Sequence, residues 1–88
     1  MAKIIASLKI LPIDINIDLN LLRDEVEKSL PENTSIYKFE EDPIAFGLVA
    51  LIAHILLPEE GEDINKIEKA IMDLKEVSQL ETLMVRRV

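Results

Sequence analysis

The hydrophobic positions of the N-terminal third follow first the period of a strand and then that of a helix. Residues 3–13 carry an apolar side chain at every second position, which predicts a strand with one wholly apolar face. In residues 18–30 the apolar positions recur at helical spacing, which predicts an amphipathic helix. Asp18 is a suitable N-cap, because its carboxylate accepts the free backbone amides of a first turn, and Pro31 ends the helix.

The middle of the chain predicts two consecutive strands. Residues 35–41 alternate, with Ile36 on one side and Tyr37 and Phe39 on the other. Residues 48–57 are almost wholly apolar, which is typical of a central strand that is at least partly covered on both faces.

The C-terminal third predicts a second helix and a last strand. Residues 58–62 form an acidic turn, and Asp63 is placed to cap a helix that ends near Lys75. Residues 77–88 then alternate as a strand does. The apolar stripe of the helix consists of Ile64, Ile67, Ile71 and Leu74.

Strand, helix, strand, strand, helix, strand is the order of the ferredoxin-like split βαβ motif. Right-handed crossovers in this motif put both helices on one face of a four-stranded antiparallel sheet. The sequence therefore predicts an α+β fold and a single domain spanning residues 1–88, because a chain of this length has room for one core. The fold does not decide the function, since it occurs in RNA-binding modules, regulatory ligand-binding domains and exchange factors alike.

The charge of the chain favours a protein partner over a nucleic acid. Seventeen acidic and ten basic residues give a formal net charge of -7 at pH 7. A field of this sign repels a phosphate backbone, and the basic residues are scattered, so we expect no direct contact with nucleic acid. A basic protein suits it better.

The absence of cysteine suits a reducing compartment, and the N-terminal residues lack the features of a signal peptide. The longest apolar run, residues 44–57, is shorter than the ~20 residues that a membrane-spanning helix needs. We therefore expect a cytoplasmic protein without a membrane segment.

Few residues are able to perform chemistry of their own. His54 is the only histidine, and two glycines are too few for a phosphate-binding loop. We expect no catalytic residue, metal site or cofactor, and interpret His54 as a sheet residue with a local hydrogen bond. Tyr37 and Phe39 have the spacing of a base-stacking platform, which leaves an RNA-binding module as an alternative, although such pairs more often pack against a neighbouring strand.

The connection between the two middle strands has two interpretations. Pro43 fixes its own φ and Gly47 accepts a positive φ, so the segment forms a bulge or a tight turn. The turn either holds Phe46 outward as a rigid knob or lets it plug the end of the core, and residue chemistry alone favours the plug. Arg86 and Arg87 are by default solvated side chains that pair with nearby acids.

This connection reads Pro43-Ile44-Ala45-Phe46-Gly47-Leu48, followed after two residues by Leu51. It resembles the signature Pro-Ile-x-Phe-Gly-Ile/Leu-x-x-Leu of the elongation factor 1-beta family, archaeal and eukaryotic. The resemblance extends to the first strand, residues 5–12, to Asp18-Leu19 and to the ending Val85-Arg86-Arg87. It spans the whole chain, as in the compact archaeal members.

The resemblance implies a guanine nucleotide exchange factor that releases GDP from elongation factor 1-alpha so that GTP binds. In the eukaryotic relatives a phenylalanine of the signature and a lysine near the C-terminal end press on the partner near its nucleotide and magnesium site. The matching residues here are Phe46, with Gly47 beside it, and Arg87. Arg86, which faces oppositely on a regular strand, is the alternative to Arg87. We expect the factor to be monomeric when free.

The chain departs from the eukaryotic pattern in two places. Arg87 replaces the lysine, and its guanidinium cannot ligate Mg²⁺ but brings positive charge against the ion. Val49 and Ala50 replace a pair of lysines, which removes a cationic contact. A regulatory domain that binds a ligand or dimerises through its sheet is the main alternative to an exchange factor.

Overall fold

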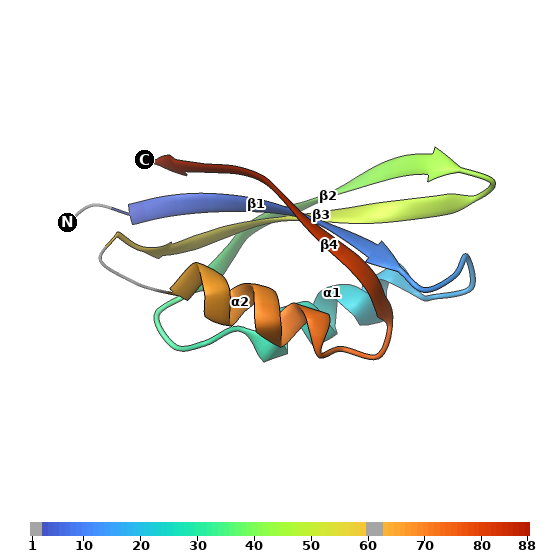
Figure 1. Ribbon diagram of the computed structural model, residues 1–88, viewed down its shortest axis with the longest axis horizontal. Coiled ribbons are helices and arrows are strands. Elements are labelled where there is room, and N and C mark those ends of the chain that lie inside the picture. The colour runs from blue at the N-terminus through green and yellow to red at the C-terminus, as the bar shows by residue number, and fades with distance from the viewer. Residues whose placement is uncertain (1–2, 60–62) are drawn as a thin grey trace.

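Six elements follow one another in the order that the sequence predicts. The computed structural model describes residues 3–59 and 63–88, and of Asp63 only the backbone. The strands are β1 (Lys3–Pro12), β2 (Ser35–Ala45), β3 (Leu48–Pro58) and β4 (Val77–Arg87), and the helices are α1 (Leu19–Ser29) and α2 (Asp63–Met72). The antiparallel sheet has the order β2-β3-β1-β4, with both helices on one face (Figure 1). The predicted α+β, ferredoxin-like fold is confirmed.

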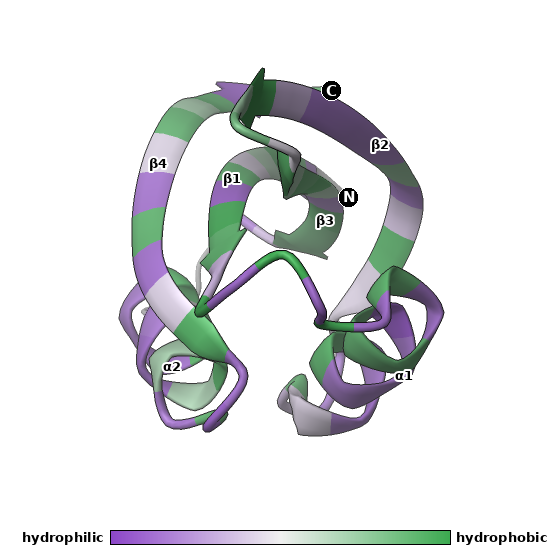
Figure 2. Cartoon of the chain, turned by 90° about the vertical axis from the view of Figure 1, so that its right-hand side faces the viewer, coloured by the Kyte–Doolittle hydropathy of each residue, from purple (hydrophilic) through white to green (hydrophobic). Residues whose placement is uncertain are grey.

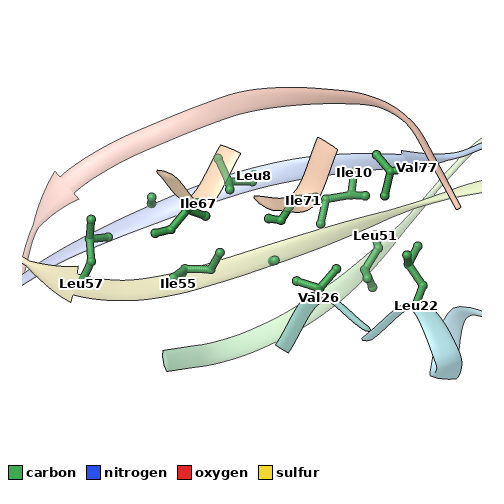
Figure 3. Close-up of a cluster of buried hydrophobic side chains, with 12 residues drawn as sticks. Leu8, Ile10, Leu22, Val26, Leu51, Ile55, Leu57, Ile67, Ile71 and Val77 are labelled. Carbon is green, nitrogen blue, oxygen red and sulfur yellow. The ribbon is translucent and has the colours of Figure 1, made fainter. Parts of the chain in front are cut away.

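The core lies between the sheet and the two helices. On β1, Leu8 and Ile10 are fully buried, and the register places them opposite Ala53 and Leu51 of β3. Because side chains alternate along a strand, this register sends the apolar residues of both central strands into one layer. The helices add Leu22, Val26, Ile67 and Ile71, which Figure 3 shows beside the side chains of the two strands.

α1 begins with the cap that the sequence predicts. Asp18 has an extended backbone, and its carboxylate accepts a hydrogen bond from the amide of Asn20 at 2.9 Å. The helix ends at Ser29, and Leu30 is extended, as a residue before a proline tends to be.

α2 ends earlier than predicted. Its last residue is Met72 rather than one near Lys75. The helix gives way to a 3₁₀-type turn here, because the amide of Leu74 donates a hydrogen bond to the carbonyl of Ile71, three residues back instead of four. The side chain of Asp63, predicted to cap this helix, lies outside the described residues, as do residues 60–62 of the predicted acidic turn.

β2 differs from its prediction in length and in the faces of its side chains. The strand continues to Ala45, and a register shift between Ile36 and Lys38 leaves Tyr37 as an extra residue. Ile36 and Phe39 therefore both pack against the core, while Tyr37 is 59% exposed. The prediction that Tyr37 and Phe39 share a face is wrong, and with it the base-stacking platform.

The molecule is elongated, and its two ends are built differently. Its principal extents are 42 × 20 × 18 Å. The turn of the β2–β3 hairpin forms one end, while the start of β1 and the end of β4 lie at the other (Figure 1). Figure 2 shows the sheet curving over the helices, with β4 on the side of α2 and β2 on the side of α1.

Truncating a core side chain of β1 tests how far stability depends on this layer. Leu8→Ala should lower the free energy of unfolding by about 2–5 kcal/mol, because it leaves a cavity at a fully buried site. Chemical denaturation measures the change. Leu83→Ala is the control, because Leu83 is 47% exposed on β4 and its truncation should cost less than about 1 kcal/mol. Equal losses would contradict this description of the core.

Candidate functional site

Two residues join β2 to β3 at the end of the hairpin. Ala45 pairs with Leu48, so Phe46 and Gly47 are the central residues of a two-residue turn. Their φ angles are 54° and 82°, both positive as in a type I′ turn, whose twist matches that of the strands. Gly47 adopts its angle without strain. Phe46 does not, because its Cβ crowds the backbone in the left-handed region.

Phe46 stands in solvent at the tip of this turn. Its exposed fraction is 99%, so the interpretation of Phe46 as a plug for the core is wrong. The hairpin continues past the core and carries the side chain away from it. A large apolar residue in a strained conformation lowers the stability of the fold and gains no burial in return. Such a side chain is a candidate for contact with another molecule.

The two C-terminal arginines lie on opposite faces of β4, as the alternation predicts. Arg87 pairs with Ile4 of β1, and its guanidinium forms an ion pair with Glu59, just after β3. Arg86 pairs with Ile5 and faces the side of the sheet that the helices leave open. A hollow of about 360 Å³ beside it is lined also by Lys3, Ile5, Tyr37, Leu56 and Val88.

The structure does not bring Phe46 and the arginines together. β3 runs from Leu48, next to the turn, to Leu57, which lies opposite the Ile4 that pairs with Arg87. Nine residue steps of strand at a rise of ~3.3 Å separate the two sites by about 30 Å. A partner that contacts both must therefore follow most of the 42 Å long axis.

A chain of three hydrogen-bonded side chains crosses the open face of the sheet. The hydroxyl of Ser7 lies 2.7 Å from Nδ1 of His54, and Nε2 lies 2.9 Å from Glu40. An ionised carboxylate only accepts, so Nε2–H donates to Glu40. When Nδ1 carries no proton, it accepts from the hydroxyl of Ser7. The local hydrogen bond expected of His54 is confirmed. The sequence gives no sign of Ser7, because only the register of β1 on β3 makes the two residues neighbours.

The order of hydroxyl, imidazole and carboxylate is also that of a hydrolase nucleophile, its base and the acid that orients the base. Ser7 is only 2% exposed, however, so its oxygen is covered against a substrate. We therefore interpret the three hydrogen-bonded side chains as a structural tie that links β1, β3 and β2.

The described part of the chain offers no cluster of three or more His, Cys, Asp and Glu side chains that is placed to hold a metal ion. None of the helices found there is long and apolar enough to cross a membrane.

Two neighbours hold the pKa of Glu40 below its usual range. The larger cause is the hydrogen bond from His54, and the next is the positive charge of Lys38, whose ammonium lies 3.5 Å from the carboxylate. Both favour the ionised form. Since the folded pKa lies below the unfolded one, the stability that Glu40 contributes is present above the unfolded pKa and is lost as the pH falls through the folded pKa.

Removing the imidazole should raise the pKa of Glu40. We expect His54→Leu to move it toward the ordinary glutamate value, because the largest cause is lost, and Lys38→Gln to move it less. NMR titration of the side-chain carboxyl carbon measures both shifts. His54→Leu should also lose less stability than wild type on acidification through this range. A larger shift in Lys38→Gln would reverse the ranking of the two causes.

Comparison with known proteins identifies the family. The family model described as the EF-1 guanine nucleotide exchange domain matches residues 5–88. Elongation factor 1-beta of Staphylothermus marinus is 45% identical over 89 aligned positions, which cover 100% of this chain and 99% of the relative. The elongation factor 1-beta of Sulfolobus acidocaldarius is 38% identical, with 97% and 96% covered, and that of Methanothermobacter thermautotrophicus is 33% identical, with 100% and 99% covered.

A solved structure shares the fold. The C-terminal domain of the MgtC protein from Mycobacterium tuberculosis matches 92% of this chain and 85% of its own length with a TM-score of 0.61. At 10% identity this likeness concerns the fold alone. The family match and the relatives of equal length go further: the chain belongs to the EF-1 guanine nucleotide exchange domain family and is a relative of the archaeal elongation factors 1-beta of translation.

Proposed function

We propose that this chain promotes the exchange of GDP for GTP on elongation factor 1-alpha by docking near the nucleotide and the magnesium ion of that GTPase. Membership of the exchange-domain family supports the reaction. One observation carries the site: Phe46 stands 99% exposed on a strained two-residue turn. The fold gains nothing from this arrangement, so we assign its use to the partner.

Phe46 acts as a wedge between the elements of the partner that contact the nucleotide. Burying a phenylalanine is worth about 1.5–3 kcal/mol, and this is available on docking because the free side chain is exposed. The pair Ala45–Leu48 closes the turn, and Pro43 pairs with Val49 beyond a register shift that leaves Ile44 as an extra residue. Because strand pairs flank the turn, little conformational entropy is lost on docking. The wedge shifts the partner toward a conformation in which the nucleotide-contacting elements are apart. The size of this shift is set by how much more tightly Phe46 binds that conformation than the one in which the elements are closed on the nucleotide.

Arg87 supplies positive charge at the other end of the surface. A guanidinium close to Mg²⁺ weakens the hold of the ion on the phosphates. In the free protein Arg87 pairs with Glu59 while 78% of its side chain stays exposed. The Glu59 side chain is 31% exposed, so the pair is only partly exposed. Surface ion pairs are worth about 0–1 kcal/mol, so a partner that offers the guanidinium a stronger interaction replaces Glu59. Arg86, beside its hollow on the open face, is the alternative.

The departure at positions 49 and 50 has a structural counterpart. Ala50 is fully buried and Val49 partly so. The positions that carry lysines in the eukaryotic pattern therefore present no exposed cation here, which leaves the turn and the C-terminal end as the contacts of this proposal.

Exchange of this kind needs no covalent chemistry by the factor. A factor that weakens the binding of nucleotide is by linkage displaced by nucleotide in turn, so the reaction is a coupling of two binding events on the GTPase. We propose further that the chain acts as a single cytoplasmic exchange domain, monomeric when free, and that its net charge of -7 steers it toward a basic partner.

Phe46→Asn should have opposite effects on stability and on exchange. Asparagine is favoured at this turn position, so the free energy of unfolding should rise by about 1 kcal/mol. The stimulated release of labelled GDP from elongation factor 1-alpha should fall by about tenfold or more, because the apolar wedge is gone. Phe46→Leu keeps an apolar side chain at the same φ and should retain more activity. Undiminished release by Phe46→Asn would overturn the wedge.

Arg87→Gln should slow saturated GDP release by about fivefold or more, and Arg86→Gln should slow it less. The effect of Arg87→Gln should shrink when EDTA removes Mg²⁺, because the charge then has no ion to oppose. A stronger effect of Arg86→Gln would transfer the role to that residue. If neither variant slows release, the arginines take no part in exchange.

A further inference from the structure

Exposed apolar side chains surround the turn that carries Phe46. Two of them lie in the loop between β1 and α1, which Figure 1 shows below the tip of the hairpin. We call the group the hairpin-end patch. It consists of Ile13, Ile15, Ile44 and Phe46, with exposed fractions of 54%, 61%, 43% and 99%.

The loop and the turn are in contact. A Cβ placed on Gly47 would lie 3.8 Å from Cγ2 of Ile15, an ordinary van der Waals distance. A hollow of about 60 Å³ lies between the two segments. Its lining consists of Gly47 and Val49 on one side and, on the other, of Pro12, Asp14, Ile15, Ile17 and Leu19. Ile15 therefore belongs to the same surface as Phe46, and the exposed Ile13, two residues before it, extends this surface toward the start of β4.

Hydrogen bonds hold this loop in place. The amide of Ile13 donates to the carbonyl of Glu76 at 3.0 Å, next to the start of β4. The carboxylate of Asp14 accepts from the amide of Asn16 at 2.7 Å. A loop fixed in this way presents its apolar side chains already ordered, which reduces the entropy lost on docking.

We infer that the hairpin-end patch is a single docking surface, in which Ile13 and Ile15 pack on the rim of the same partner pocket that receives Phe46. The inference rests on the proposed exchange function. A partner that buries a side chain exposed at 99% must also cover the surface around it, and Ile15 lies against the turn itself. The pocket of the GTPase therefore has an apolar rim.

The charge of the hairpin-end patch indicates which side chains of the partner lie at the edge of its pocket. Asp14 is exposed within the loop, and no ion pair joins it to another described residue. Nearby carboxylates of β2, by contrast, pair with Lys9 and Arg23. The free charge of Asp14, on a chain of net charge -7, suits basic side chains at the edge of the pocket.

The members of the patch have different tasks. Phe46 acts on the arrangement of the partner and so on the rate of the saturated complex. Ile13 and Ile15 contact the partner alike before and after nucleotide leaves, so they contribute uniform binding. They set the concentration of factor that is needed, and not the rate at saturation.

The experiment is the rate of labelled GDP release from elongation factor 1-alpha as a function of factor concentration. The double variant Ile13→Ser, Ile15→Ser should raise the half-saturating concentration by about tenfold or more and leave the saturated rate within about twofold. Leu83→Ser is the matched control, because Leu83 is 47% exposed but lies roughly 15–20 Å along the sheet from Ile13. Thermal melts confirm that each variant is folded.

Asp14→Asn tests the border separately, because its side-chain oxygen still accepts from the amide of Asn16 while the charge is lost. It should raise the half-saturating concentration at low salt, and the difference from wild type should disappear at high salt.

The outcomes separate the two proposals. If wild type and Phe46→Asn behave as expected but the isoleucine double variant matches wild type, the inference is wrong and the exchange function stands. A double variant that lowers the saturated rate at an unchanged half-saturating concentration also overturns the docking role. If wild type does not accelerate release at all, the proposed function fails, and the inference fails with it.

Discussion

The register in which β1 pairs with β3 decides which side chains meet the helices. Leu8 opposite Ala53 and Ile10 opposite Leu51 put the apolar faces of both strands into one layer. A slip of one residue would turn them to the open face and leave the helices without a core. The same pairing brings Ser7 beside His54, so the polar tie on the other face depends on the interaction that forms the core.

The hairpin turn is the place where local and global preferences disagree. Its two positive φ angles suit Asn-Gly, and the chain has Phe-Gly. The ladder of β2 on β3 is long enough to impose this conformation on Phe46, because the strands pair up to Ala45 and Leu48. A conflict of this sort between residue type and backbone is more informative than exposure alone, since scattered exposed apolar residues are ordinary on protein surfaces.

Features that depend on short stretches of sequence are predictable here, and so is the topology that the order of the elements implies. The residue-by-residue register between strands is not. The order of the elements and the cap at Asp18 follow from local periodicity and capping chemistry. The bulge at Tyr37 exchanges the two faces to which the later side chains of β2 point, and no residue type in this stretch predicts it. Phe46 is misjudged by composition because apolar residues are usually buried, whereas the length of the hairpin decides where it stands.

The residues of the candidate site are predictable from the sequence, but the distance between them is not. The residue types at its two ends are visible in the sequence, because the resemblance marks Phe46 and Arg87. Their separation is not, since it arises from the length of β3 and from the position of β4 beside β1. The distance between two residues that are far apart in sequence depends on the strand order and on the lengths of the strands between them.

The sheet holds Phe46 and Arg87 at a fixed distance from each other. Hydrogen bonds between strands fix the distance from the turn to the end of β4, so the factor has little freedom to adjust its span. A partner that engages both ends is held only while its own two contact points are the same distance apart. Binding then measures the shape of the partner, and a change of that shape is enough to release the factor.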